Sequence, residues 1–406
     1  MAPRGQAPAS ASDGGGALEG FLRTFPMVPL PALIAVKLRA ALNSTLPGVA
    51  RWRLRFLVLI FIMLLPLRVV GWAVDHVLVA HRARRVQIRD PVFVFAPPRT
   101  GSTSLHRALA ADSETFVAPH MHELLLPFVL SGALLDFARA SGVHRLMTTS
   151  FHTLIGLFGM EPSELSRRHP MGLFKADEDD MLVAFNLFVG EMVWVGEPQP
   201  ASWLYSTRIL QFPGWYQDCL ASFHATCMRK VLWRRGGGRR LLTKSHLQQL
   251  GPALARMHPT ASFVTIVRPQ AAQLCSWWSL QACASRDLHG VDTSGPEYLD
   301  MRLTFLKEYN EVAREFFGDG KGEGGRRSAV QFSDFVRDPL AAVAWLLGRL
   351  GVEVDRDTLG PLVASAVAED AQHVGGTKSF TNATLADIGI TANELERRVG
   401  RPLTGS

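Results

Sequence analysis

An arginine, a glycine and several hydroxyl side chains follow an apolar segment that begins at residue 92. Residues 92–105 read VFVFAPPRTGSTSL, which predicts a buried strand over Val92–Ala96, a short loop, and a helix that starts near Thr103. Backbone N–H groups of such a loop and the N-terminus of the helix together form a site for an anion. Arg99 adds a fixed positive charge with paired donors for a phosphate or a sulfate.

The same loop lacks the lysine of nucleotide triphosphatases. Those enzymes have the pattern GxxxxGK[ST], whereas Ser102 follows Gly101 here, which argues against ATP hydrolysis. Gly101 allows the backbone to approach a ligand closely. The alternative interpretation is an ordinary strand–helix turn capped by a hydroxyl group. The hydroxyl side chains available to an anion are those of Thr100, Ser102, Thr103 and Ser104.

A second predicted strand also ends in a charged residue. Residues 262–279 read SFVTIVRPQAAQLCSWWS, which predicts a strand over Ser262–Val267, then Arg268, then a helix. Ser276 comes eight residues after Arg268, about two helical turns, so both side chains can face one ligand. Ligands of α/β sheets collect beyond the carboxyl ends of the strands. The alternative is a surface ion pair for Arg268 and a solvent-facing Ser276.

A third apolar segment ends in a lysine and a histidine. Residues 241–247 read LLTKSHL, and they place Lys244 and His246 at the end of a strand predicted over Arg240–Thr243. The ordinary pKa of histidine suits proton transfer near neutral pH, so His246 is a candidate general base. The alternative is that His246 only begins the next helix.

These motifs resemble those of sulfotransferases that use 3′-phosphoadenosine 5′-phosphosulfate (PAPS). PRTGSTSL is similar to their 5′-phosphosulfate loop, P-[KR]-[ST]-G-[ST]-[ST]; bacterial and algal members of the "sulfotransferase family" commonly have Arg where cytosolic enzymes have Lys. Arg268 and Ser276 resemble the 3′-phosphate motif, although Pro-Gln follows Arg268 where relatives often have Asp-Pro or Asn-Pro. LLTKSHL resembles the cytosolic Lys-Thr-His-Leu segment, whereas the closer family usually has Lys-Ser-Pro-x-His.

The resemblance covers roughly residues 90–390 and implies a reaction and a site. The reaction is in-line transfer of a sulfuryl group from PAPS to a hydroxyl or amine acceptor, and it requires no metal. His246 is the implied base, while Arg99 and Lys244 stabilise charge on the departing phosphate. The residues implied to bind the donor are Arg99, Thr100, Gly101, Ser102, Thr103, Ser104, Arg268, Ser276 and Lys378.

The resemblance also implies a rival base, Glu123, in the segment HELLLP. Related enzymes often carry a glutamate a few residues before a proline here, and tyrosylprotein and carbohydrate sulfotransferases use a glutamate after the helix of the phosphate loop. A carboxylate in this role needs a raised pKa or tight placement. His120 and His122 are weaker candidates. The acidic run of residues 177–180 is expected to begin a helix or to fold back on basic groups.

Short apolar runs alternate with helical patterns from residue 91 onward, which predicts the α/β class with a parallel sheet covered on both faces. The resemblance specifies this as the sulfotransferase variety of the P-loop fold. The strands are expected at Val92–Ala96, Arg240–Thr243, Ser262–Val267 and Ala329–Phe332, and the helices at Ser104–Ala111, Leu247–Met257, Ala271–Gln281 and Leu340–Leu350.

The region before the first strand is different. We expect a disordered tail over residues 1–19, a helical N-terminal region over 20–89, and the sulfotransferase domain over 90–400. Residues 56–74 hold one charge, Arg68, and are just long enough to span a bilayer as a helix. Arginines flank both sides, which leaves the orientation open. An interfacial helix and a buried helical hairpin are the alternatives.

Composition adds broader limits. The net charge of +7 fits a polyanionic ligand or an acidic membrane surface, and without a nucleic-acid-binding motif we expect no nucleic-acid partner. The four cysteines do not form a zinc pattern. We expect a membrane-associated protein, at the Golgi or another endomembrane. A P-loop kinase or NTPase and a non-catalytic membrane scaffold are the alternatives, and a carbohydrate, a lipid or a small molecule remains possible as the acceptor.

Overall fold

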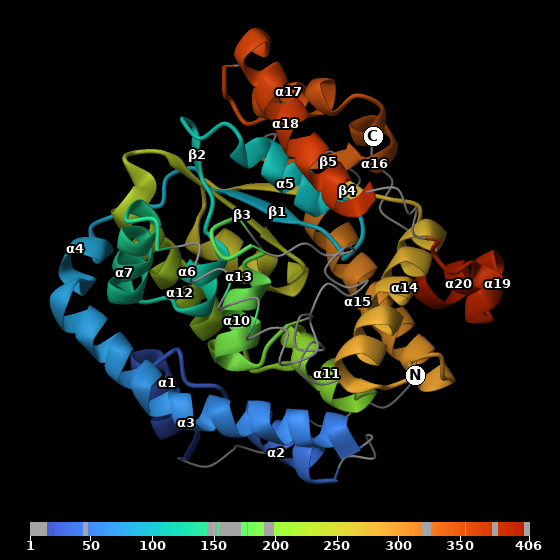
Figure 1. Cartoon of the computed structure of the whole chain (residues 1–406), viewed down its shortest axis with the longest axis horizontal. Coiled ribbons are helices and arrows are strands. Elements are labelled where there is room, and N and C mark those ends of the chain that lie inside the picture. The colour runs from blue at the N-terminus through green and yellow to red at the C-terminus, as the bar shows by residue number, and fades with distance from the viewer. Residues whose placement is uncertain are drawn as a thin grey trace, which may run out of the picture.

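The computed structural model describes residues 14–43, 48–143, 149, 153, 172–176, 178–190, 199–318, 326–353, 355–375 and 381–401. Within these ranges the chain forms a five-stranded sheet with helices on both faces (Figure 1), which confirms the predicted α/β class. All pairs are parallel, in the order β2-β3-β1-β4-β5. The strands are β1 (Val92–Phe95), β2 (Phe116–Val117), β3 (Arg240–Ser245), β4 (Ser262–Val267) and β5 (Arg327–Gln331).

Alternation along β1 gives the sheet an apolar layer on each face. Val92 and Val94 belong to one cluster of buried side chains, whereas Phe93 and Phe95 belong to another. The first cluster is shared with α5 (Ser102–Ala110), α17 (Pro339–Arg349) and α18 (Arg356–Gly375), and the second with α12 (Gly214–Val231), α13 (Gly251–Met257) and α15 (Pro296–Phe317).

A further apolar cluster lies beside the sheet, on the side of β4. It is centred on Trp203, Trp277 and Phe305, whose rings are 5.2 to 6.0 Å apart. This cluster fixes the helix that follows β4 against its neighbours, and so it fixes the start of that helix near the sheet. The helices that contribute are α11 (Pro200–Thr207), α14 (Gln270–His289), α15, α19 (Leu385–Ile388) and α20 (Ala392–Val399).

The N-terminal region is helical, as expected, and α3 (Gly48–Leu78) lies along one side of the molecule (Figure 1). By length and composition, its part from Leu54 to Leu78 could cross a membrane. α1 begins at Gly14 and so includes the last residues of the segment expected to be a tail. The other helices here are α1 (Gly14–Thr24), α2 (Pro31–Asn43) and α4 (Ala80–Arg84).

Several local details differ from the expected elements; for example, β5 begins at Arg327, and Phe332 belongs to the helix after it. β2 was not anticipated, because two residues carry no readable pattern. β3 continues to Ser245, so Lys244 lies inside the strand instead of after it. His246 precedes a short 3-10 helix and not α13 itself. The remaining elements are α6 (Met121–Leu125), α7 (Val129–Ala140), α10 (Asp180–Leu187), the 3-10 helices η2 (Ile209–Gln211) and η4 (Gln248–Leu250), the π-helix η3 (Leu232–Gly236) and α16 (Phe332–Arg337).

Candidate active site

The loop between β1 and α5 has the geometry of an anion site. Arg99 has a φ of 66° and Gly101 a φ of 91°, so the chain turns sharply before α5 begins at Ser102. Thr100 is buried, and its hydroxyl donates to the carbonyl of Pro97 at 2.9 Å, which closes the turn. The first N–H groups of a helix have no partner inside it, and here they face the turn that carries Arg99.

Gly101 cannot be replaced without disturbing this loop. Its φ lies in the left-handed region, where a Cβ is unfavourable. A Cβ atom there would also lie 2.8 Å from Cε2 of Phe332, at the start of α16. Both the turn and the close approach of an aromatic ring therefore require glycine.

Arg99, Arg268 and Ser276 meet at this loop. Nε of Arg99 donates to the hydroxyl of Ser276 at 3.1 Å, and Arg268 donates to the backbone carbonyl of Arg99 at 2.7 Å. The Arg268 guanidinium lies 4.6 Å from the ring centre of Phe332. Partial burial lowers the pKa of Arg268. The two motifs, 169 residues apart in the chain, thus place two guanidinium groups and a hydroxyl beside one helix N-terminus.

Gln273 also holds the loop between β1 and α5, a contact that the sequence analysis did not predict. Its side chain is buried and donates to the carbonyl of Pro98 at 3.2 Å. Gln273 lies on α14 between Arg268 and Ser276, so one helix start supplies three contacts to the loop. In the sequence, the only signal for Gln273 is its position about one helical turn before Ser276.

A buried polar cluster lies at the carboxyl end of β3, next to the loop. Lys244, His246 and Glu178 are 0, 5 and 2% exposed. Nζ of Lys244 contacts Glu178 Oε1 and lies 3.0 Å from His246 Nε2, while His246 Nε2 lies 3.1 Å from Glu178 Oε2. The hydroxyl of Thr103 donates to Glu178 Oε1 at 3.2 Å, which joins the first turn of α5 to the cluster. Phosphate loop, lysine and histidine therefore form one continuous site.

The histidine of this cluster has a defined orientation. Nδ1 of His246 lies 2.7 Å from the carbonyl oxygen of Ala96, which only accepts, so Nδ1 carries a proton. Nε2 is then the atom that exchanges a proton. Burial and the Lys244 charge act to lower the pKa of His246, but the Glu178 and Asp180 carboxylates outweigh them and raise it.

Asp180 fixes the backbone under the cluster. Oδ1 accepts from the backbone N–H of His246 at 2.8 Å and from the hydroxyl of Ser245. Burial raises the pKa of Asp180 to about 6. The acidic run thus both begins α10 and folds back on Lys244, the two roles expected for it. The sequence did not distinguish Glu178 or Asp180 as parts of the site.

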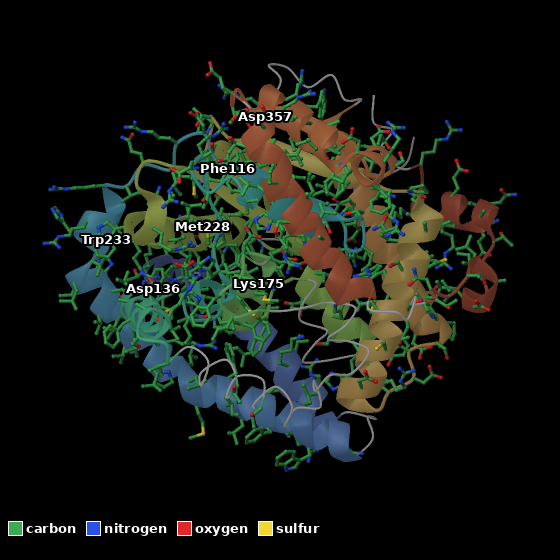
Figure 2. The ribbon with its side chains drawn as sticks, turned by 45° about the horizontal axis from the view of Figure 1, so that its top comes forward. Phe116, Asp136, Lys175, Met228, Trp233 and Asp357 are labelled. Carbon is green, nitrogen blue, oxygen red and sulfur yellow. The ribbon has the colours of Figure 1, made fainter. Side chains whose placement is uncertain are left out.

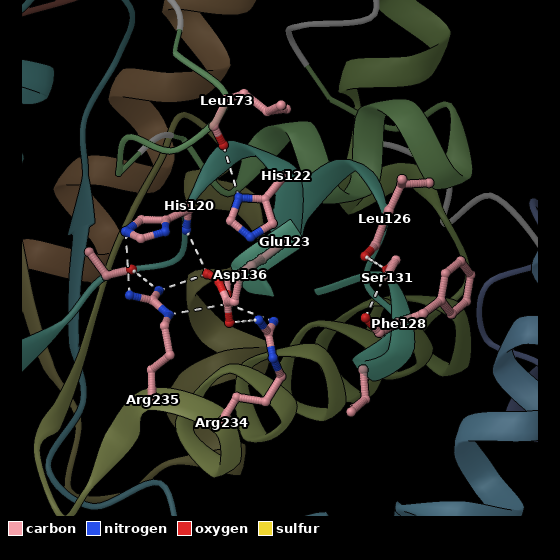
Figure 3. Close-up of polar contacts among 12 residues, drawn as sticks. His120, His122, Glu123, Leu126, Phe128, Ser131, Asp136, Leu173, Arg234 and Arg235 are labelled. Carbon is pink, nitrogen blue, oxygen red and sulfur yellow. Dashed lines mark hydrogen bonds and ion pairs between the residues drawn. The ribbon is translucent and has the colours of Figure 1, made fainter. Parts of the chain in front are cut away.

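Glu123, the rival base, is tied to two arginines (Figure 3). Its carboxylate is 2% exposed and accepts from Arg234 at 3.1 Å and from Arg235 at 2.7 Å. The backbone N–H of His120 donates to Oε2 at 2.9 Å. These contacts join α6 to η3, the π-helix that continues α12. With this many donors on its oxygens, Glu123 has the environment of a structural ion pair.

His120 and His122 also have partners that restrain them. Nε2 of His120 lies 3.3 Å from Arg235, and burial lowers the pKa of His120 to about 3. Nδ1 of His122 lies 2.9 Å from the carbonyl of Leu173, and burial lowers its pKa as well.

Among the residues that the structure describes, two groups of side chains have ligand atoms close enough together for a metal ion. They are His120, His122 and Glu123, and Glu178, Asp180 and His246. In each group a carboxylate is already paired with a cation: Arg235 in the first and Lys244 in the second. This pairing removes much of the negative charge that would attract a metal.

Substituting Glu123 with glutamine is expected to affect stability more than chemistry. Removing one partner of a buried ion pair costs roughly 3–5 kcal/mol, because the remaining charges stay buried. Thermal unfolding of Glu123→Gln should show that loss, while the turnover of the folded fraction stays near wild type. Asp136→Asn is the matched control. It removes a contact between Arg234 and the Asp136 carboxylate, whose side chain is 42% exposed, so it should lower the free energy of unfolding only slightly. Loss of turnover without loss of stability would make Glu123 the base.

Of the residues expected to bind the donor, Ser102 is buried at the start of α5, and Thr103 and Ser104 are partly exposed beside it. Lys378 lies outside the described residues, and its role stays a prediction.

The chain is similar to known sulfotransferases in sequence family and in fold. The family described as "Sulfotransferase family" matches residues 91–356. The crystal structure of sulfotransferase STF1 from Mycobacterium tuberculosis H37Rv has a TM-score of 0.61 and 18% identity, covering 91% of each chain. That of sulfotransferase STF9 from Mycobacterium avium has a TM-score of 0.64 and 13% identity, covering 87% of this chain and 85% of the other. At these identities the two structures show a shared fold. No curated protein matches the chain in sequence.

Proposed function

Because this chain belongs to the sulfotransferase family and is an enzyme of that family, we propose that it transfers a sulfuryl group from PAPS to a hydroxyl or amine acceptor. One observation supports this most directly. Arg99 contacts both Arg268 and Ser276 at the phosphate loop, and Thr103 of the same loop contacts the Lys244–Glu178–His246 cluster. Donor-binding groups and a candidate base therefore adjoin each other.

In the proposed reaction, the acceptor oxygen or nitrogen attacks the sulfur in line with the bond to the leaving phosphate. A new bond to sulfur forms, the bridging S–O bond breaks, and 3′-phosphoadenosine 5′-phosphate leaves. Nε2 of His246 takes the acceptor proton. Arg99 and Lys244 stabilise the negative charge on the departing oxygen; because an arginine is a poor proton donor, the part of Arg99 is electrostatic. No step uses a metal.

The proposed donor site extends from the loop to α14. The N–H groups at the start of α5, with Thr100, Ser102, Thr103 and Ser104, bind the 5′-phosphosulfate. Arg268 and Ser276 bind the 3′-phosphate, and Lys378 is proposed to reach the same phosphate.

The contacts of the two side chains favour His246 over Glu123 as the proposed base. The Ala96 carbonyl fixes its ring and leaves Nε2 as the reactive nitrogen. The carboxylates of Glu178 and Asp180 stabilise the imidazolium that proton transfer forms, which raises its pKa. The Glu123 oxygens, in contrast, are engaged by Arg234, Arg235 and a backbone N–H.

The decisive experiment is an acceptor screen with PAPS that carries radiolabelled sulfate. The purified full chain is expected to label at least one hydroxyl or amine compound among carbohydrates, lipids and small alcohols. Heat-treated chain and the Arg268→Ala variant are the negative controls. Binding of 3′-phosphoadenosine 5′-phosphate without transfer to any acceptor would instead favour a non-catalytic protein with this fold, and ATP hydrolysis would favour an NTPase.

The pH dependence of the reaction tests the role of Glu178. The pKa of His246 in the folded protein is raised above 6.5, so its neutral form predominates only at a pH above that raised pKa. The rate should therefore fall as the pH is lowered through the raised pKa. Glu178→Gln removes a stabilising carboxylate, so the acidic limb should move to lower pH. We expect kcat to fall by roughly tenfold, less than the 10²–10⁴-fold that general-base catalysis itself contributes. Glu308→Gln, which removes an ion pair with Arg208, is the control and should not move the limb.

We also propose that the protein associates with a membrane, as at the Golgi or another endomembrane. The apolar stretch of α3 from Leu54 to Leu78 and the net charge of +7 support this.

A further inference from the structure

One side of α3 exposes a row of large apolar side chains. Leu59, Met63, Leu67, Val70 and Val77 are exposed by 54, 68, 65, 58 and 78%. Their spacing of three, four or seven residues places them along one side of the helix. Contiguous exposed apolar surfaces of this kind mark a binding site for a protein or a membrane. In Figure 2, α3 runs along the edge of the molecule with side chains directed outward.

The opposite side of the same helix is packed. Leu54, Val58, Phe61 and Trp72 are 2, 5, 6 and 7% exposed and follow the same helical spacing. Phe61 lies 4.0 Å from the ring of Phe188, at the end of α10. The sequence looks apolar all round because α3 has two apolar sides; one packs on other residues that the structure describes, and the other is exposed among them.

Two charged residues in the second half of α3, Arg68 and Asp75, also face the catalytic domain. Arg68 donates to the backbone carbonyl of Phe185 at 3.0 Å and lies 4.5 Å from the ring centre of Phe61. Asp75 is 3% exposed, pairs with Lys230 at 2.7 Å and accepts from the backbone N–H of Val129 at 3.0 Å. A helix that crossed a bilayer would have to leave these partners, and it would take Arg68 and Asp75 into the hydrocarbon.

We propose that α3 lies in the plane of a membrane surface, with its row of exposed apolar side chains among the acyl chains and the catalytic domain outside. The proposal rests on the membrane association proposed above and specifies its geometry. In this geometry α3 does not span the bilayer; it binds the membrane from one side only.

Charge at the two ends of the helix favours lipid over a second copy of the chain. Arg51 and Arg55 lie at its beginning, and Arg82, Arg84 and Arg85 follow its end, the last four with exposed side chains. Anionic headgroups would neutralise both ends. Two copies of α3 packed against each other, in either direction, would bring arginines against arginines.

α7 begins beside the end of α3 and also exposes apolar side chains. Its Leu130, Leu134 and Phe137 are exposed by 71, 63 and 70% and recur every three or four residues. α7 begins at Val129, whose N–H is held by Asp75 of α3.

Binding of the full chain to vesicles tests the surface. Vesicles of phosphatidylcholine with about one third phosphatidylserine should pellet the chain, and added salt should weaken the binding. The double variant Met63→Glu/Leu67→Glu should reduce the bound fraction by roughly tenfold or more. The control Val336→Glu/Trp345→Glu changes residues that are 60 and 49% exposed on α16 and α17, and it should bind as wild type does.

Depth measurements distinguish a helix in the plane from one that spans. Fluorophores attached one at a time at Leu59→Cys, Leu67→Cys and Val77→Cys should all be quenched best by shallow bromolipids. A deepest position at Leu67 with shallower ends would show a span and overturn the proposal. If the chain does not bind vesicles but forms a dimer, and Met63→Glu/Leu67→Glu dissociates that dimer, this side is an interface between copies.

Calorimetry with 3′-phosphoadenosine 5′-phosphate and transfer to a soluble acceptor separate this proposal from the proposed reaction. Both should be the same in wild type and in Met63→Glu/Leu67→Glu, which also shows that the variant folds. If transfer fails in wild type while vesicles still bind, the reaction is wrong and the membrane surface stands.

Discussion

Replacing His246 with glutamine is expected to lower kcat by about 10²–10⁴-fold, the contribution of a positioned general base. Glutamine retains a donor for the Ala96 carbonyl and similar bulk, so the buried cluster keeps its packing. It has no basic nitrogen to take the acceptor proton. Steady-state kinetics with saturating PAPS measure the loss, and calorimetry should show donor affinity within about threefold of wild type, because the 3′-phosphate contacts proposed for Arg268 and Ser276 are untouched.

The control for this variant is His76→Gln, at an exposed histidine on α3, which should leave both quantities unchanged. Full activity of His246→Gln would remove His246 from the mechanism. If Glu123→Gln instead loses turnover while keeping donor affinity and stability, the base lies on α6.

Replacing Arg268 with alanine is expected to weaken binding of 3′-phosphoadenosine 5′-phosphate by roughly 100-fold, ~2.8 kcal/mol, as for a lost charge-assisted contact. Two effects combine. The proposed partner of the 3′-phosphate is removed, and the carbonyl of Arg99 loses its donor at 2.7 Å, which loosens the phosphate loop. Calorimetry at fixed ionic strength measures the dissociation constant.

Arg337→Ala is the matched control, since that arginine is 77% exposed on α16 and pairs only with a neighbouring aspartate. It tests whether general loss of positive charge is enough to weaken binding. An unchanged dissociation constant in Arg268→Ala, with an unchanged unfolding temperature, would contradict the assignment of the 3′-phosphate site.

The meeting of the phosphate loop with Arg268 and Ser276 could be predicted because it follows from topology. Neighbouring parallel strands deliver their carboxyl ends to one edge of the sheet, and β1 pairs with both β3 and β4. Three sequence segments that each end a strand must therefore converge. This prediction requires only the positions of the strands, and short apolar runs in the sequence indicate those positions.

Contacts that do not arise at strand ends could not be predicted. Glu178 meets Lys244 across 66 residues, and no local pattern shows which acid of the run 177–180 turns inward. Arg234 and Arg235 lie in a π-helix that turns them toward Glu123, and no local pattern in the sequence indicates this. In α3, hydropathy counts apolar residues without showing which of them pack on the protein itself, as Leu54, Val58, Phe61 and Trp72 do.

One short helix joins the chemistry to the surface of the molecule. α10 has eight residues, about 12 Å; its first, Asp180, holds the backbone of His246, and Phe188 at its end contacts the ring of Phe61 on α3. A helix this short is stiff, so a shift of α3 must either break the aromatic contact or move Asp180. The proposed membrane attachment and the protonation of the proposed base are thereby mechanically linked, and a substitution at Phe61 or Phe188 is expected to change the rate of reaction through the backbone alone.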